Sequence, residues 1–340
     1  MAADTLPSKP SFHWDIGSGK LSKRVSQVEI QMALDQTASM SMMVSLTAQE
    51  AGSLSSRDIP QEASFKWADR SFFKGHLADV SHLDTHRIRL TFQDSLFASR
   101  KAHENLFFKQ QTLQECLDKL ASKLGLSTRY LGNFGETIPS IHLTGPSFFD
   151  HLGELSNEFG FYFFAKAASD QICFLKVGSH VKDVEIPSKS PVTGVGHTQS
   201  PNHYYSQVTF RHLDQHSLES KEKRMSASDL YSPLAAFRDH SGYREKTSWK
   251  HAKGSFEAHV NESYHFDSAD QLVKNQLSKK LMQQESLRMT TFEPVGIPGD
   301  RLKVKGPAFS NSHEGAYLIR SCHIIASGAN PRMEIEAIRP

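Results

Sequence analysis

Residues 112–131 read TLQECLDKLASKLGLSTRYL, and residues 147–164 read SFFDHLGELSNEFGFYFF. These two stretches decide the fold of the middle of the chain, because they repeat one local pattern. In each, apolar residues recur at helical spacing and a glycine follows, Gly125 in the first and Gly160 in the second. Glycine is the usual residue where a helix ends in a left-handed conformation. The sequence therefore predicts two short helices that each lead into a strand.

Both helices carry start signals and one apolar face. Thr112 and Glu115 have the spacing of a capping box, and Ser147 and Asp150 open the second copy. The apolar faces consist of Leu113, Cys116, Leu117, Leu120 and Leu124 in the first helix and Phe148, Leu152, Leu155 and Phe159 in the second. Neither copy contains a nucleophile beside a base or a phosphate-binding loop. We expect a compact scaffold here and not a catalytic pocket.

Short alternating runs on both sides of this unit favour antiparallel barrels or sandwiches over a parallel sheet. We expect an α+β chain that is mainly β, with two β-barrel-like tube lobes, an inserted small α/β domain and a further helix in the second half. The expected boundaries are a first lobe at 1–100, the insert at 101–178, a linker at 179–202 and a second lobe at 203–340. The second lobe is expected to hold a polar excursion at 214–253 and a helix at 268–289. The main expected strands are 25–34, 39–48, 73–80, 87–92, 172–177, 203–213, 300–306, 315–326 and 332–340.

The composition indicates a folded protein without an obvious nucleic-acid footprint. The chain has 340 residues, of which 38% are hydrophobic and 22% charged, enough for two or three domains. Its formal net charge is +2, and the basic run 221–224 is accompanied by Glu219 and Glu222. We therefore expect no sequence-specific binding of nucleic acid.

The three cysteines, Cys116, Cys173 and Cys322, are odd in number and far apart. Each lies in an apolar stretch, which predicts buried thiols in a reducing compartment. No stretch has the length of apolar sequence that spans a bilayer, and the N-terminus lacks the pattern of a secretory signal. We expect synthesis in a cytoplasm and no membrane anchor.

The usual motifs of catalysis and nucleotide binding are absent from the sequence. It contains no G-x-S-x-G, no H-E-x-x-H, no Walker loop and no Rossmann glycine triplet. GSGK at 17–20 resembles part of a phosphate loop but lacks the first glycine at the required distance. Glu104, Glu115, Glu154 and Glu158, the acids a wall hydrolase would need, lie in or beside the two helices, where capping or solvent exposure explains most of them.

Histidine is abundant, with 18 residues, so chance clusters are expected. His76, His82 and His86 span one expected hairpin, but no cysteine or carboxylate of matched spacing accompanies them. Surface positions are the better interpretation. Other histidines are scattered through the second half, at His197, His203, His212 and His216. We assign no catalytic, cofactor-binding or metal-binding residue, and no cofactor.

The order of several phrases resembles the phage late control protein D family, the hub proteins of contractile tails, which are related to the hub part of type VI secretion spike proteins. The phrases are FFKGHLADV at 72–80, the opening at 107–117, SFFDHLGELSNEFGF at 147–161, GIPGDRLKVKG at 296–306 and GAYLIRSCH at 315–323. The resemblance covers about 70–178 and 290–340. Each phrase is weak alone, and their shared order carries the resemblance.

This resemblance implies a structural protein of a virion tail baseplate, assembled in the host cytoplasm, and not an enzyme. It implies a homotrimer in which two similar lobes per chain form a ring of six quasi-equivalent positions. Such a ring joins a hexameric tail tube to a trimeric spike, contacts other baseplate (wedge) proteins and lets DNA pass through its channel. Because the chain ends at Pro340, just after the last expected strand, the spike is expected to be a separate protein.

Two alternatives remain open at this stage. One is a tail-associated peptidoglycan hydrolase, which requires a pair of carboxylates in a cleft. The other is a tail module that binds host carbohydrate through exposed aromatic residues, for which the candidates are Tyr204, Tyr205, Trp249 and Tyr264. The sequence does not distinguish a DNA-delivering phage from a toxin-delivering particle.

Overall fold

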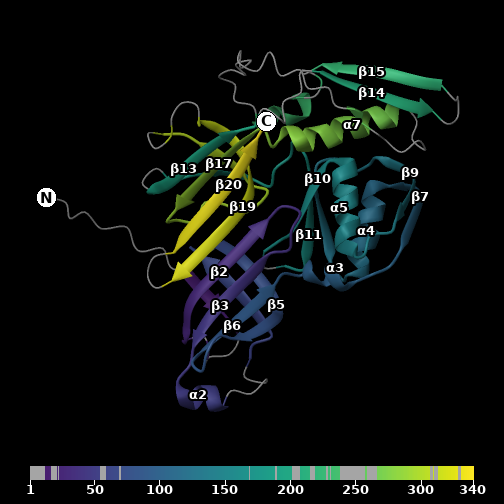
Figure 1. Ribbon diagram of the computed structural model, residues 1–340. Helices are drawn as coiled ribbons and strands as arrows, with labels where there is room; N and C mark the ends of the chain where they lie inside the picture. Colours follow the sequence, from purple (N-terminus) through teal and green to yellow (C-terminus); the bar gives the residue numbers. More distant parts are fainter. Residues whose placement is uncertain are drawn as a thin grey trace.

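The computed structural model describes residues 12–16, 21, 23–53, 59–68, 70–167, 169–187, 190–200, 207–214, 219–226, 229, 231–237, 257–258, 266–306, 309, 313–327 and 331–340. Its largest element is a curled twelve-stranded sheet to which both halves of the chain contribute (Figure 1). A smaller α/β body lies beside this sheet. The expected α+β, mainly β fold class is confirmed.

Each half of the chain gives the large sheet six strands. The first half supplies β1 (Phe12–Asp15), β2 (Val25–Ala33), β3 (Ser39–Ser45), β4 (Glu62–Trp67), β5 (Arg70–His82) and β6 (Arg87–Gln93), with the short helix α2 (Ala48–Ser53) after β3. The second supplies β12 (Asp183–Glu185), β13 (Val192–Gln199), β17 (Glu285–Thr291), β18 (Arg301–Val304), β19 (Gly315–Ser327) and β20 (Arg332–Arg339). In space the order is β1-β4-β5-β6-β3-β2-β19-β20-β17-β13, with β18 also paired to β19 and β12 to β18.

The two sets of strands meet where β2 pairs antiparallel with β19. At this seam Ile30 lies opposite Ile324, and both are fully buried. Strand side chains alternate between faces, so β2 buries Val28, Ile30 and Met32, the face expected from the sequence. One hydrophobic core therefore runs under both lobes. The purple and yellow strands lie side by side at this seam in Figure 1.

The insert consists of three helices and five strands with a hydrophobic core between them. Its elements are α3 (Phe97–Lys101), β7 (Leu106–Thr112), α4 (Leu113–Lys123), β8 (Ser127–Leu131), β9 (Thr137–Leu143), α5 (Phe148–Phe159), β10 (Phe161–Ala165) and β11 (Gln171–Lys176). The predicted capping box is present. The backbone N–H of Glu115 donates to the Thr112 hydroxyl, and the backbone N–H of Thr112 donates to the Glu115 carboxylate. Gly125 and Gly160 have φ values of +70° and +62°. Both expected helix–glycine–strand units are confirmed, and β8 and β10 flank β11 on either side.

The second-half helix α7 (Phe266–Leu281) is shorter than expected and covers a different part of the fold. The expected helix at 268–289 is wrong about its end, because β17 starts at Glu285 and joins the large sheet. Met289 lies seven residues beyond Met282, which is two turns of a helix. The apolar spacing of the helix therefore continues by chance into β17, where buried and exposed residues alternate as in a strand. Helix α7 packs against α5, and Val273 and Leu277 are buried in the core of the insert (Figure 1).

The expected linker at 179–202 contains two strands of the large sheet, β12 and β13, so the absence of regular structure there is a wrong expectation. The register of β13 against β17 shifts between Thr193 and Gly196, which interrupts the alternation that identifies a strand. The polar excursion at 214–253 likewise contains β15 (Glu219–Ser226) and the 3₁₀ helix η2 (Ser232–Phe237). Strands β14 (Gln207–Asp214), β15 and β16 (Glu257–Ala258) form a separate small sheet.

A partly buried ion pair joins the first lobe, the insert and α7. We call it the Asp35 junction: Asp35 lies in the turn after β2, and its Oδ2 is 2.7 Å from Nζ of Lys279 on α7. The other carboxylate oxygen accepts the backbone N–H of Phe163 at 3.0 Å. Lys279 Nζ lies 5.0 Å from the ring centroid of Tyr162. Burial lowers the pKa of Lys279, and Asp35 opposes that shift. Three segments far apart in sequence are therefore held at one point.

Gly160 has two reasons to be glycine, its positive φ and the close approach of α7. A Cβ built on Gly160 would lie 2.2 Å from the Asn275 carbonyl oxygen. We expect Gly160→Ala to lower the free energy of unfolding by about 2–5 kcal/mol, because a left-handed alanine is strained and the helices must separate. The urea midpoint measures this. Gly153→Ala on the same helix is the matched control, since a Cβ there meets nothing within 4 Å, and an equal loss in both variants would contradict the packing argument.

Asp300 is a fully buried carboxyl in the turn before β18. One of its oxygens accepts the Ile297 N–H at 3.1 Å. Burial raises its pKa from 3.8 to about 6, and the Ile297 hydrogen bond opposes that shift. A folded-state pKa above the unfolded value means that ionisation is penalised in the fold. This group therefore stabilises most at pH below 3.8, and that contribution is lost as the pH rises to about 6.

We accordingly expect Asp300→Asn to gain stability over the wild type as the pH rises. Its advantage grows between about pH 4 and about pH 6 and reaches about 3 kcal/mol, since the pKa of Asp300 is raised from 3.8 to about 6 and each pKa unit is worth about 1.4 kcal/mol. Urea unfolding across this range measures the difference. Asp79→Asn, at an exposed position of β5, should show no such trend. A constant difference between Asp300→Asn and the wild type at every pH would refute the expectation.

Candidate functional site: a polar row across both lobes

One line of side chains crosses the large sheet at right angles to its strands. Each residue of this line lies directly opposite the next one, on the neighbouring strand. In order across the sheet, the residues are Glu62, His76, Gln93, Ser39, Gln31, His323, Glu334, Thr290 and Thr193. We call this line the polar row. It runs from β4 to β13 through both lobes, and every member has a polar side chain. Residues that face each other in an antiparallel pair lie on the same face of the sheet.

The row lies on the face opposite the core, because strand neighbours alternate between the two faces. Ile30 is buried while its neighbour Gln31 is exposed. Met289 is likewise buried while its neighbour Arg288 is exposed. On this face the surface has a hollow of about 530 Å³. Its lining includes Gln31, Ser39, Arg288, Thr290, His323 and Glu334. The polar row therefore crosses a hollowed surface and not a flat one.

Charges of opposite sign alternate around the seam on this face. His323 lies between two acids, with Nε2 2.7 Å from Glu29 and Nδ1 3.4 Å from Glu334. Glu336 lies 3.4 Å from Arg288 and 3.5 Å from Arg320. These pairs are partly exposed, so each contributes little to stability. Because positive and negative side chains are paired, this surface is hydrated and has no strong electrostatic potential of a single sign.

This arrangement offers hydrogen-bond donors, acceptors and paired charges, but no set of groups for covalent chemistry. Among the described residues, no three His, Cys, Asp or Glu side chains are grouped to hold one metal ion. The three cysteines are buried, as expected, and burial raises the pKa of Cys116 to about 12.

The structure separates the three histidines of the first-lobe hairpin. His76 belongs to the polar row and pairs with Glu62 at 3.6 Å. His82 ends β5, and His86 lies in the following turn, where its N–H donates to Asp84. The polar row itself was missed in the sequence, because its members come from nine separate strands and only the registers bring them together. The available signal was the alternation of polar residues with apolar ones along single strands, as for Gln27, Glu29 and Gln31 of β2.

The four glutamates considered for a hydrolase either interact with other side chains of the insert or lie on one of its helices. Glu104 forms an ion pair with Lys123, and Glu115 belongs to the capping box, where hydrogen bonds from Thr112 lower its pKa. Glu154 and Glu158 lie on α5. Several other candidates lie outside the described residues: the 17–20 segment, Tyr204, Tyr205, Trp249, Tyr264, His203 and His216. In the part of the chain that is described, no helix has the length and apolar character to cross a bilayer.

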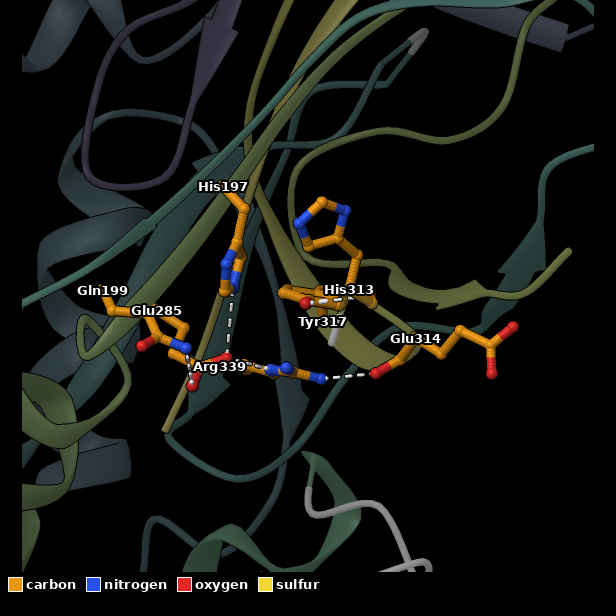
Figure 2. A network of polar contacts seen from close by, with 7 residues as sticks. All are labelled: His197, Gln199, Glu285, His313, Glu314, Tyr317 and Arg339. Carbon is orange, nitrogen blue, oxygen red and sulfur yellow. Dashed lines mark hydrogen bonds and ion pairs between the residues drawn. The ribbon is translucent and has the colours of Figure 1, made fainter. Parts of the chain in front are cut away.

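A second polar cluster lies on the core side of the sheet, at the end of the second lobe (Figure 2). Glu285, which is 5% exposed, accepts from Arg339 Nε at 2.6 Å and from Gln199 at 3.2 Å, and lies 3.3 Å from His197 Nε2. Arg339 also lies over the Tyr317 ring, at 4.4 Å. We call this the Glu285 cluster. In the sequence, the cluster is indicated by Glu285, an acid on the same face of β17 as Leu287 and Met289. Those two residues are buried, so the acid lies at a core position of the strand.

No protein-family model matches the sequence, and no curated protein matches it. Solved structures match its fold over nearly the whole chain. A tail protein from Neisseria meningitidis MC58 gives a TM-score of 0.65 at 12% identity, covering 98% of this chain and 97% of that one. The 43 kDa tail protein of prophage MuSo2 from Shewanella oneidensis gives 0.61 at 13% identity, covering 93% of each.

An E. coli component of the type VI secretion system, itself reported to resemble tail proteins of bacteriophage T4, gives a TM-score of 0.59 at 12% identity. This match covers 93% of the present chain and 73% of that protein. At such identities the likeness is one of fold. The fold of this chain is that of phage tail proteins and of a type VI secretion component.

Proposed function

We propose that this chain is the structural baseplate hub of a contractile phage tail or a tail-like injection particle. Three copies form a pseudo-sixfold ring that joins the hexameric tail tube to a separate trimeric spike. The polar row faces the channel of this ring. Other baseplate proteins bind the ring outside the channel, and the chain performs no catalysis.

The observation that carries this proposal is the polar row running unbroken across two six-stranded lobes of one chain. Two lobes per chain allow three chains to present six similar positions, which is the symmetry match between a threefold and a sixfold partner. The seam pairing of β2 with β19 joins the lobes in one continuous sheet. The tail proteins that share the fold support a role in a tail.

The chemistry of the polar row suits a channel. Side-chain amides and hydroxyls, as in Gln31, Ser39 and Thr290, keep the surface wet. The acids near the seam are matched by Arg288, Arg320 and His323, so a passing polyanion meets no strongly basic surface that would retain it. Either DNA or a folded effector of suitable width would pass without a specific binding site.

The proposal predicts three copies of the chain in a complex with the tube and spike proteins. Native mass spectrometry of the 38.1 kDa chain, mixed with both partners, measures the copy number directly. One or two copies per complex would exclude the ring. Zymography on peptidoglycan distinguishes the hydrolase alternative, and clearing by the pure chain would favour it.

The orientation of the polar row has a separate test based on cysteine labelling. Because the native thiols are buried, Gln31→Cys should react rapidly with a polymer-bearing maleimide in the folded protein, and Ile30→Cys should react only after unfolding. A polymer on Gln31→Cys should then block passage of cargo through assembled particles. The same polymer on Lys109→Cys, at an exposed position of the insert, is the control for bulk. Equal delivery by both labelled particles would place the row outside the channel.

A further inference from the structure

The two lobes share one strand topology. In the first lobe the neighbours in space are β4, β5, β6, β3 and β2, and in the second they are β18, β19, β20, β17 and β13. Both sets follow the same order along the chain, and every neighbouring pair in them is antiparallel. The correspondence ends at the outermost strands, since β1 is antiparallel to β4 whereas β12 is parallel to β18. Strand β5 therefore corresponds to β19, and β2 corresponds to β13.

Local irregularities match between the lobes residue by residue. The pairing of β5 with β6 shifts register directly after Leu77, and the pairing of β19 with β20 shifts directly after Ile319. One backbone hydrogen bond recurs at the same place. The Leu77 N–H donates to the Gln61 carbonyl at 2.8 Å, and the Ile319 N–H donates to the Asp300 carbonyl at 2.9 Å. Leu77 is therefore the counterpart of Ile319.

Strand β19 has two partners in succession along one of its sides. Residues 315–318 pair with β18, and residues 321–327 pair with β2. Both partners lie opposite β20, which pairs with the other side of β19. The seam therefore joins the two lobes at the place where β18 ends.

Strand β5 offers the same side with only its first half paired. Both β5 and β19 have 13 residues. Residues 70–76 of β5 pair with β4, but in the described part of the chain no strand continues along 79–82, the counterparts of 321–324. In the second lobe, β13 pairs with β17 alone among the described strands (Figure 1). The chain thus has two open edges, and they correspond to the two strands that are joined in its own seam.

The composition of β13 suits an edge that becomes covered. Edge strands that stay in water usually carry charged residues or proline, which discourage pairing with other chains. Strand β15, at the edge of the small sheet, reads ESKEKRMS and has five Lys, Arg or Glu residues among its eight. Strand β13 also has eight residues, VTGVGHTQ, and contains none of these types, no Asp and no proline. The chain therefore protects one of these edges and leaves the other able to pair.

We propose that β13 of one copy pairs antiparallel with residues 79–82 of β5 in a second copy, repeating the seam between chains. This contact rests on the proposed ring and names the surface that closes it. Each copy contributes one edge of each kind, so the contact is head-to-tail, the type that forms a ring when the rotation closes. Leu83, which follows β5 and is 40% exposed, would be covered by the second copy.

The seam also sets the register of the contact, because it places His323 opposite Gln31. Ser81 is the counterpart of His323, since each lies four residues beyond the matched positions Leu77 and Ile319. Two lines of directly opposite residues give the counterpart of Gln31. They run through His76, Gln93, Ser39 and Gln31 in the first lobe and through Leu318, Ile338, Ser286 and Thr198 in the second. We therefore expect Ser81 of one copy to lie opposite Thr198 of the next, on the face of the polar row.

The contact between copies is more polar than the seam. At the seam, Ile30 and Ile324 lie opposite each other and are fully buried. By the same correspondence, the residues in their places are His197 and His82. A polar contact suits chains that fold before they assemble, because each free edge must first be stable in water.

Mixing two single-cysteine variants tests this pairing. Ser81→Cys and Thr198→Cys are combined, assembled with the tube and spike proteins, and oxidised with copper phenanthroline. Opposite residues of an antiparallel pair have Cα atoms about 4.5–5.5 Å apart, which a disulfide can span, so a linked dimer of the chain should be the main product. Either variant alone should give no dimer, and the native thiols are buried.

The register has a matched control on the same strand. Thr193 lies on the same face of β13 as Thr198, about 17 Å further along. Thr193→Cys mixed with Ser81→Cys should therefore give no dimer. Equal yields with Thr193→Cys and Thr198→Cys would overturn the proposed pairing.

Native mass measurement of the same complexes separates this inference from the proposed function. Three copies without a linked dimer would refute the strand pairing and leave the ring standing. A linked dimer in complexes that hold only two copies would support the pairing and exclude the threefold ring. One copy per complex and no dimer would refute both.

Hydrogen exchange of the wild type provides a second measurement if the cysteine variants do not assemble. Strand pairing takes backbone amides out of water, so the amides of 79–82 and 192–199 should gain protection on assembly. The amides of 219–226, in the charged edge strand β15, should keep their exchange rates. Unchanged exchange at 79–82 and 192–199 in the assembled complex would refute the pairing.

Discussion

The arrangement of this molecule depends on the Asp35 junction. The turn after β2 carries Asp35, and β2 is the strand through which the two lobes meet. The same carboxylate binds Lys279 of α7 and the Phe163 amide of the insert. The Lys279 and Asp35 side chains are only 12% and 28% exposed, so removing one partner leaves the other charge incompletely solvated in the fold. The position of the insert relative to the seam is therefore specified electrostatically as well as by packing.

A second polar contact supports the same placement. Lys176 of β11 pairs with Glu136, and the Asn275 amide of α7 donates to the same carboxylate at 3.4 Å. Since Gly160 allows α5 to approach the backbone of α7 at Asn275, polar and steric constraints act on one helix surface. Helix α7 thus belongs with the insert in packing, although β17 follows it after three residues and returns to the large sheet.

The sequence predicted local structure well wherever the signal was local. The capping box at Thr112, the glycine stop at Gly160 and the alternation of Val28, Ile30 and Met32 each depend on a few neighbouring residues, and each is confirmed. The end of α7 was predicted wrongly because helical and strand periods overlap near Met289. The polar row and the Glu285 cluster were not predictable as sites, because members such as Gln31 and His323 are far apart in the sequence and meet only through strand registers.

The seam between β2 and β19 has a consequence for biosynthesis. Residues 25–33 leave the ribosome long before residues 315–327, so the edge of β2 that β19 later covers stays open for most of translation. Open edges of this kind invite pairing with other nascent chains. The outward residues Gln27, Glu29 and Gln31 are polar, which makes such an encounter less adhesive. The pairing of β2 with β19 can therefore form only after residues 315–327 have been made, and until then the polar outward face of β2 is what limits unwanted contacts.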